Sequence, residues 1–404
     1  MFLSQKAAQT VGKTVSARVD FANAGKGVVT QEKSRNAVVK DGCLTAAKGV
    51  VALNETDVFA AFECALGTLL CKNDGVYLKT ADALKKIHTC VFASPSFLYA
   101  AKQKKLLVSE KGKGTFVFDG ENFQQVFEKG FSTLALCKER VFGADGALYF
   151  CERDDFSSWN GKLQLSQPVA VTESGDLWAV GNDLFKIDFS DCLQNTKVIP
   201  VYKNVGKVYE KTISVFGNKM FFLTDGGLMC YSANKTEKIA EDVNFSAENF
   251  CAVGQVYRGK YFLSASEKGG SNDLLLCVDC KSCKTLCVWD VKADFLTSCD
   301  RLLWTHNGKL FTFGDGFADV FWQSKSFDFG NAYAKKYLRK LLVDTEYPLD
   351  VHVVTEKDRK IYRFDGSSFP QQLNICGYFC KLRLELFSQG ATKVNDVCVL
   401  AQTY

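Results

Sequence analysis

A short sequence unit, built of two apolar strands around a Gly, Asp or Asn turn, recurs from about residue 51 to residue 320. Clear copies are GDLWAVGNDLFKID from Gly175, GNKMFFLTDGGLMCYS from Gly217 and NGKLFTFGDGFADVFWQS from Asn307. A repeat spaced by several tens of residues, with four short strands to a unit, is typical of β-propeller blades rather than of a helical solenoid. At about 45 residues per blade the span predicts about six blades, with five or seven left open.

Length and composition agree with an all-β chain that contains more than one folded body. The 404 residues exceed the roughly 100–200 of an ordinary domain. Hydrophobic residues make up 47% and charged residues 24%, which is enough apolar material for a sizeable core, and the 33 Phe residues favour strands. We therefore predict an extended N-terminal arm (1–50), a β-propeller (51–320) and a C-terminal β-sandwich-like domain (321–404).

The two ends of the chain differ from the repeat. Residues 1–50 are rich in Gly, Ala, Lys and Asn, which predicts an arm that buries little by itself and orders against the propeller or a neighbouring subunit. After residue 321 the apolar patterns lengthen, with turn signals at Asp365-Gly366 and Gln389-Gly390, as expected for a β-sandwich. Residues 332–342 fit either a strand or a helix with Leu338, Leu341 and Leu342 on one face.

Charge and hydropathy exclude two partner classes. The 50 basic and 45 acidic residues leave a net charge of +5 without a long Lys/Arg block, so we expect no specific nucleic-acid partner. The first 20 residues lack the apolar segment of a secretory signal. No run approaches the roughly 18 apolar residues of a membrane span. We expect a chain that is made and kept in the cytosol.

The chain contains 17 cysteines, an odd number, and most lie inside apolar strand patterns such as LALCKERV, LYFCERD and DVCVLAQ. In such positions cysteine behaves as a small buried hydrophobic residue. Disulfide frameworks belong to short secreted chains, so free thiols in a reducing compartment are the expected state.

The metal candidate that the sequence offers is the run CVDCKSCKTLC, which holds Cys277, Cys280, Cys283 and Cys287. Its C-x2-C-x2-C-x3-C spacing matches a ferredoxin run for an iron–sulfur cluster, but Val288 stands where ferredoxins have proline. The flanking residues predict a hairpin, whose strands spread ligands to alternate faces. Zinc sites normally need cysteine pairs separated by a longer insert. We predict no metal and no cofactor.

Three histidines are available for acid–base catalysis: His88, His306 and His352. His88 lies two residues from Cys90, but residues two apart in a strand point the same way, and no third group orients them. His306 falls in a predicted turn, where a solvated or capping histidine is ordinary. We predict structural roles for all three histidines.

The acidic turn CERDDFSSW places Glu152, Asp154 and Asp155 where local hydrogen bonding is expected. The segment 172–178 approaches the Asp-box of glycosidase propellers without matching it. Neither a P-loop nor a dinucleotide fingerprint is present. The single Trp289-Asp290 pair lacks the Gly-His partner of a WD repeat. The sequence therefore predicts that the protein is not an enzyme.

Several stretches resemble the β-propeller structural proteins of tailed bacteriophages, found in tail and head-to-tail components. They are STLALCKERVFGADGALYFCERDDFSSWNG from Ser132, LLWTHNGKLFTFGDGFADVFWQSKSFDFG from Leu302, and the closing GYFCKLRLELFSQGATKVNDVCVLAQTY. The segment SRNAVVKDGCLTAAKGV is similar to the arm that precedes the first blade in that family. The resemblance covers most of the chain but assigns no functional residue, because the function of these proteins lies in their surfaces.

The resemblance implies a non-enzymatic structural component of a virion, assembled in the host cytoplasm into a ring or collar of the tail or head-to-tail connector. Its expected partners are tail, portal or connector subunits and copies of itself. The alternative is a carbohydrate- or receptor-binding propeller module, which aromatic-lined pockets repeated blade by blade would favour. The position in the particle and the copy number stay open.

Overall fold

The computed structural model describes residues 13–19, 21, 28–29, 31–81, 83–165, 167–189, 196–298, 300–329, 333–334, 336–367 and 371–403. The chain forms two compact units: a propeller unit (Val51–Leu286 and Asp290–Phe313) and a sandwich unit (Met1–Val50, Cys287–Trp289 and Gly314–Tyr404). In these ranges helical structure is confined to the 3-10 turn η2 (Glu210–Thr212). None of the described helical residues forms a segment long and apolar enough to cross a bilayer. The predicted all-β propeller fold is confirmed.

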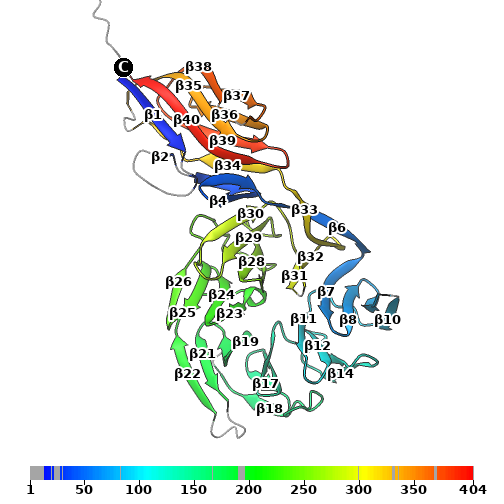
Figure 1. Cartoon of the computed structure of the whole chain (residues 1–404). Coiled ribbons are helices and arrows are strands. Elements are labelled where there is room, and N and C mark those ends of the chain that lie inside the picture. The colour runs from blue at the N-terminus through cyan, green and yellow to red at the C-terminus, as the bar shows by residue number, and fades with distance from the viewer. Residues whose placement is uncertain are drawn as a thin grey trace, which may run out of the picture. The chain divides into compact units, whose positions relative to one another are not determined.

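Seven four-stranded antiparallel sheets form the blades in the described part of the chain, and Figure 1 shows them placed around a common centre. Blade 1 contains β7 (Val58–Cys64), β8 (Gly67–Lys72), β9 (Gly75–Lys79) and β10 (Leu84–His88); blade 2, β11 (Ser96–Ala100), β12 (Lys105–Glu110), β13 (Gly114–Phe118) and β14 (Phe123–Phe127); blade 3, β15 (Leu134–Cys137), β16 (Arg140–Ala144), β17 (Leu148–Phe150) and β18 (Gly161–Leu163); blade 4, β19 (Ala170–Ser174), β20 (Asp176–Val180), β21 (Leu184–Asp188) and β22 (Lys197–Tyr202).

The remaining blades follow the same order, except for the last strand. Blade 5 contains β23 (Ser214–Phe216), β24 (Lys219–Thr224), β25 (Gly227–Ser232) and β26 (Lys235–Lys238); blade 6, β27 (Val253–Tyr257), β28 (Lys260–Ala265), β29 (Leu274–Asp279) and β30 (Thr285–Trp289); blade 7, β31 (Phe295–Ser298), β32 (Leu302–His306), β33 (Lys309–Phe317) and β6 (Lys48–Thr56). Blade 7 thus takes its outermost strand from the chain segment that precedes blade 1, which closes the ring.

The structure has seven blades, which lies within the range of five to seven that the sequence left open around the expected six. The first strands of the blades begin at Val58, Ser96, Leu134, Ala170, Ser214, Val253 and Phe295. Successive starts are 36 to 44 residues apart, shorter than the assumed repeat. The fourth strand of blade 7 also lies far from its neighbours in the sequence, so a count along the chain misses it.

Local turn chemistry explains how the hairpins form. The turn between β32 and β33 consists of Asn307 and Gly308, with φ values of 49° and 70°. Arg258 and Gly259 make a turn of the same type between β27 and β28, with φ values of 48° and 72°. Two-residue turns with positive φ at both positions match the twist of antiparallel strands, and Asn-Gly is the sequence that adopts them most easily.

Neighbouring blades share hydrophobic side chains. One buried cluster joins Phe142 and Phe150 of blade 3 to Leu177 and Ile187 of blade 4. Phe150 and the adjacent Phe189 contact edge to face, with ring centroids 4.9 Å apart. Because each sheet is covered on both faces, strands such as β13 and β16 are buried along their whole length.

The sandwich unit consists of two sheets. The larger contains β1 (Lys13–Val19), β2 (Val28–Val29), β4 (Ala37–Lys40), β5 (Cys43–Ala46), β35 (Lys336–Thr345), β38 (Gln371–Phe379) and β40 (Lys393–Thr403); the smaller contains β3 (Gln31–Arg35), β34 (Val320–Ser324), β36 (Leu349–Thr355), β37 (Arg359–Phe364) and β39 (Leu382–Ser388). One core lies between them, with Trp322, Val351 and Val399 fully buried.

The first 50 residues differ from the predicted arm, because their described strands belong to the sandwich. β1 pairs with β40 and β3 pairs with β34. Ala17, Val19 and Leu44 lie in the buried core. The composition was misleading because strands of a two-layer sandwich bury small apolar side chains on one face and need few large ones. Residues 1–12, 20, 22–27 and 30 of the predicted arm lie outside the described residues.

The helix alternative at residues 332–342 is wrong for residues 336–342, which belong to strand β35. Register shifts between Leu338 and Lys340 against both neighbouring strands. This bulge places Leu338 and Leu341 on the buried face although they are three residues apart. A three-residue spacing is also what a helix produces, and that explains the ambiguity of the pattern.

Candidate functional site

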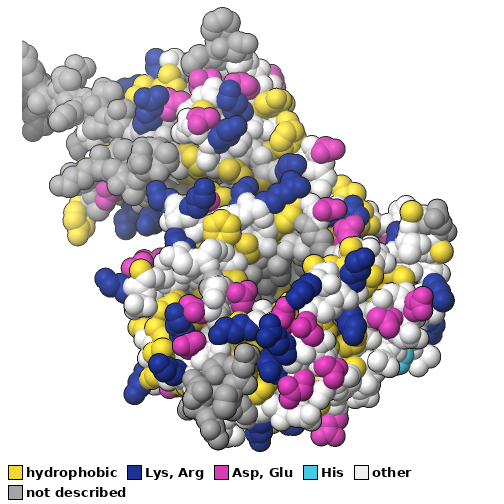
Figure 2. Space-filling view, turned by 60° about the horizontal axis from the view of Figure 1, so that its bottom comes forward, with side chains coloured by type: hydrophobic (Ala, Val, Ile, Leu, Met, Phe, Trp, Pro, Cys, Tyr) yellow, Lys and Arg dark blue, Asp and Glu magenta, His cyan; other side chains and the backbone are white. Residues whose placement is uncertain are grey.

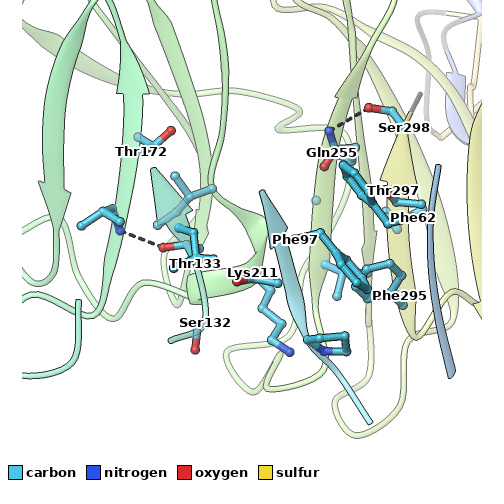
Figure 3. A pocket seen from close by; sticks show the side chains of 18 residues that line it. Phe62, Phe97, Ser132, Thr133, Thr172, Lys211, Gln255, Phe295, Thr297 and Ser298 are labelled. Carbon is cyan, nitrogen blue, oxygen red and sulfur yellow. Dashed lines mark hydrogen bonds between the residues drawn. The ribbon is translucent and has the colours of Figure 1, made fainter. Parts of the chain in front are cut away.

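A cavity of about 230 Å³ lies at the centre of the propeller unit (Figure 3). Residues in or directly before the first strand of every blade line it: Phe62, Pro95, Ser96, Phe97, Ser132, Thr133, Leu134, Val171, Thr172, Lys211, Ile213, Val253, Gly254, Gln255, Phe295, Leu296, Thr297 and Ser298. The seven-bladed ring therefore creates the site, because short inner strands meet there from segments far apart in the sequence.

Three phenylalanines from consecutive blades of the ring gather on one side of the cavity. Phe62 and Phe97 are stacked with ring centroids 5.2 Å apart, and Phe97 meets Phe295 edge to face at 5.7 Å. Figure 3 shows the three rings together, with Thr133 and Thr172 on the opposite side. Blades 7, 1 and 2 thus provide an aromatic wall.

Hydroxyl and amide groups line much of the rest, and several of them bridge adjacent blades. The Thr133 hydroxyl accepts a hydrogen bond from the Val171 backbone N–H, at 2.8 Å. Gln255 donates from its side-chain amide to the Ser298 hydroxyl at 2.9 Å, and Ser298 donates to the Val256 carbonyl at 3.0 Å. These bonds fix the inner strands against each other and keep the cavity walls in place.

Lys211 is the charged residue in this lining, and it extends from η2 beside blade 5 to blade 2. Its ammonium donates to the backbone carbonyl and to the hydroxyl of Ser94. Burial lowers the pKa of Lys211 to about 8, although the carboxylates of Glu110 and Glu210 act in the opposite direction. Glu110 accepts the Ser94 N–H at 3.0 Å, so it also holds the segment that receives the lysine.

This arrangement defines what the cavity can bind. An ammonium group has three N–H donors, and two of those of Lys211 have partners on Ser94. A small ligand with an apolar face for the phenylalanines and hydroxyl or carboxylate groups for the opposite side matches the lining. Pockets that combine aromatic walls with a few polar groups are the usual form of small-molecule sites.

The cysteine run does not gather its thiols. Cys277 lies in β29 and Cys287 in β30, while Cys280 and Cys283 belong to the turn between these strands. Burial raises the pKa of both Cys277 and Cys280 to about 12. Among the described residues, no group of three or more His, Cys, Asp or Glu side chains is placed to hold a metal. The predicted absence of metal stays a prediction.

The histidines occupy three separate places. His88 accepts a hydrogen bond through Nδ1 from the backbone N–H of Cys90 at 2.9 Å, so the ring contacts the amide rather than the thiol. His306 lies 3.1 Å from the Asp294 carboxylate at the end of β32. His352 belongs to the sandwich unit, where burial lowers its pKa.

The acidic turn of blade 3 is held by its own hydrogen bonds. Asp155 accepts the Ser157 N–H at 3.0 Å, and Glu152 pairs with Arg140 at 3.0 Å. Trp289 donates its indole N–H to the Lys48 carbonyl at 3.1 Å. The Cys, His and Asp candidates therefore lie apart from the cavity, none of them in its lining.

Sequence reasoning missed the cavity residues. Phe62, Phe97 and Phe295 stand in short strands without a motif, and Lys211 meets Ser94 across 117 residues of sequence. The available signal was the repeat itself: once the first strand of each blade is aligned, a polar or aromatic residue recurs in inward-facing strands such as SFLYA, AVTES and FLTS.

Comparison with known proteins adds little to this geometry. No protein-family model matches the sequence, and no curated protein matches it. A chain in the crystal structure of a mitotic checkpoint complex is similar over 73% of this chain and 97% of its own length, with 12% identity and a TM-score of 0.47. The extracellular domain of a one-component system from B. thetaiotaomicron is similar over 88% of this chain and 62% of its own length, with 7% identity and a TM-score of 0.46. The propeller assignment rests on the strand order and the ring of inner strands.

Proposed function

We propose that this protein is a non-enzymatic structural protein that binds other proteins and copies of itself. The observation that carries this proposal is a set of exposed apolar side chains on the sandwich unit. Tyr333 is 97% exposed, Phe317 55%, Ile361 53% and Tyr378 51%. Aromatic side chains are enriched in protein interfaces, where they supply much of the binding energy.

The finer proposal is a component of a tailed-phage virion, in the tail or the head-to-tail connector, that assembles in the host cytoplasm. Its support is the sequence resemblance to phage propeller proteins. Tail, portal or connector subunits are then the partners. On the face shown in Figure 2, basic side chains lie among acidic ones, and such mixed charge gives specificity to protein contacts rather than a phosphate-tracking stripe.

Incorporation into particles tests the proposal. A gene deletion is complemented with the wild-type chain or with the triple variant Phe317→Ser, Ile361→Ser, Tyr378→Ser, and purified particles are quantified by mass spectrometry. We expect the triple variant to fold and to lose incorporation by roughly tenfold or more, the effect of about 1.4 kcal/mol of binding energy. The matched control is Phe250→Ser, which changes an exposed ring of the propeller unit.

Two results distinguish the virion assignment from the assignment of the binding interface. If the wild-type chain is absent from purified particles, the virion assignment is wrong. If the triple variant enters particles as well as wild type does, these three exposed side chains are not part of the interface.

The second candidate function is a binding module for a small carbohydrate, and the central cavity favours it. The aromatic faces of Phe62 and Phe97 and the hydroxyls opposite resemble the mixed lining that sugars need. The rings come from three neighbouring blades only, so the pocket is single rather than repeated blade by blade. Titration calorimetry with a panel of mono- and disaccharides tests this candidate function. The proteins compared are wild type, Phe97→Ala and the control Phe250→Ala. Binding lost only in Phe97→Ala supports this candidate, and no heat with any sugar contradicts it.

A further inference from the structure

A thiol–thiol contact joins two neighbouring blades. Cys283, in the turn between β29 and β30 of blade 6, places its Sγ 3.7 Å from the Sγ of Cys230 on β25 of blade 5. Both are free thiols. A disulfide needs about 2 Å between the sulfurs, so side-chain rotation must close the remaining gap.

The turn that carries Cys283 is held in place. Its backbone has a φ of 58°, and its N–H donates to the Asp279 carbonyl at 2.8 Å. The Asp279 carboxylate accepts the N–H and the hydroxyl of Ser282, both at 2.7 Å. A non-glycine residue keeps a left-handed conformation only where its surroundings determine it. The position of the Cys283 thiol is therefore set by the turn and not by chance rotation of a loose loop.

The two thiols have different environments. Cys283 is half-buried, and the Lys219 ammonium donates to its sulfur at 3.4 Å. The thiolate is the form of cysteine that reacts with oxidants. Cys230 is buried, and burial together with the nearby Cys283 raises its pKa to about 12. An oxidant from solvent thus meets Cys283 first.

We propose that Cys283 and Cys230 are an oxidation site that forms an inter-blade disulfide in the presence of hydrogen peroxide. The Cys283 thiolate attacks one peroxide oxygen, the O–O bond breaks, and the leaving hydroxide takes a proton to become water, which leaves Cys283 as a sulfenic acid. The Cys230 sulfur then attacks the Cys283 sulfur. The S–S bond forms, the S–O bond breaks, and the hydroxyl leaves as water with the Cys230 proton. Peroxide gains two electrons, one from each thiol.

The cross-link would tie together residues 53 apart in the sequence. Closing a loop of this size in the unfolded chain stabilises the folded state. We expect the melting temperature of the oxidised protein to rise by about 5–10 °C. The thiol pair would then act as a reversible staple between blades 5 and 6.

The test uses the full-length chain, reduced and then exposed to a small excess of hydrogen peroxide. Peptide mapping by mass spectrometry without reduction should find the Cys230–Cys283 peptide, and dithiothreitol should remove it. Cys230→Ala should leave Cys283 as a sulfenic acid that dimedone traps. Lys219→Met should slow disulfide formation by about three- to tenfold. Cys251→Ser, a change at an exposed thiol, is the matched control and should behave as wild type.

The peptide map of the wild-type protein tests the proposal even if a variant folds poorly. Cys283 linked to Cys280 or Cys287, Cys283 converted to sulfinic acid with Cys230 still reduced, or both thiols unreacted after other cysteines are oxidised would each overturn the proposal. A melting temperature that does not change when the Cys230–Cys283 bond forms would overturn the staple.

Discussion

Lys211 is a single side chain that connects two distant parts of the propeller ring by hydrogen bonds. Lys211 contacts Ser94 of blade 2 from a position beside blade 5, and its desolvated ammonium is bound by neutral oxygen atoms. Burying a cation costs free energy that hydrogen bonds return in part. This side chain therefore links the two sides of the ring at the expense of some stability.

The lowered pKa of Lys211 gives a pH-dependent stability. Its pKa is about 8 in the folded state against an ordinary value of about 10.4 in the unfolded chain. Between these values the unfolded state binds more protons, so the free energy of unfolding rises with pH. We expect wild type to gain about 1–3 kcal/mol between pH 7 and pH 10.5 relative to Lys211→Met. Urea denaturation of both proteins at the two pH values measures this. Equal pH dependence in the two proteins would show that the lysine is not desolvated.

At the scale of the element, strand β5 shows that the N-terminal segment is part of a core. Leu44 is fully buried in the sandwich, whereas Val39 on the neighbouring strand β4 is 36% exposed. The two side chains belong to one hairpin, in which Val39 pairs with Leu44. Burial, and not the position in the chain, therefore decides the contribution of each to stability.

Replacing these two residues distinguishes a core strand from a surface arm. Leu44→Ala removes buried methyl groups and should lower the free energy of unfolding of the sandwich by about 2–5 kcal/mol. Val39→Ala should change it by less than about 0.5 kcal/mol. Chemical denaturation followed by amide hydrogen exchange in peptides from the sandwich strands reports on this core. If both variants were as stable as wild type, the segment would not contribute to the core.

Much of the element content could be predicted from the sequence, and the exceptions have physical causes. The Asn307-Gly308 turn was recognisable because its residues favour positive φ. The strand at Leu338 to Leu341 was ambiguous because a bulge imitates helical spacing. The aromatic wall of the cavity could not be predicted, since Phe62 and Phe295 meet only when the ring closes.

At the scale of the whole molecule, the ring depends on strand β6 for closure. Leu53 of β6 packs against a buried cluster that contains Val58, Leu303 and Leu310. That cluster joins the first and last blades. Every blade packs on two neighbours. A loss of packing at this seam between blades 1 and 7 therefore affects the unfolding of the whole ring and not of one blade.

Two substitutions on β6 test this dependence. Leu53→Asp places a charge at the seam and should destabilise the propeller by about 2–4 kcal/mol. Val51→Asp, at a side chain that is 47% exposed, should have little effect. Differential scanning calorimetry measures the propeller transition. A transition that is unchanged in Leu53→Asp, with faster amide exchange in β6 alone, would mean that the strand frays without opening the ring.

The pairing of β1 with β40 has a consequence for the synthesis of the chain. Lys13 pairs with Thr403, so the first strand leaves the ribosome long before its partner exists. At about 5–20 residues per second the delay is roughly 20–80 s. Throughout that time the N-terminal strands expose unpaired backbone and apolar side chains. Strand β6 likewise stays unpaired until β33 has been synthesised. We therefore expect nascent-chain chaperones to bind these N-terminal strands while the rest of the chain is synthesised.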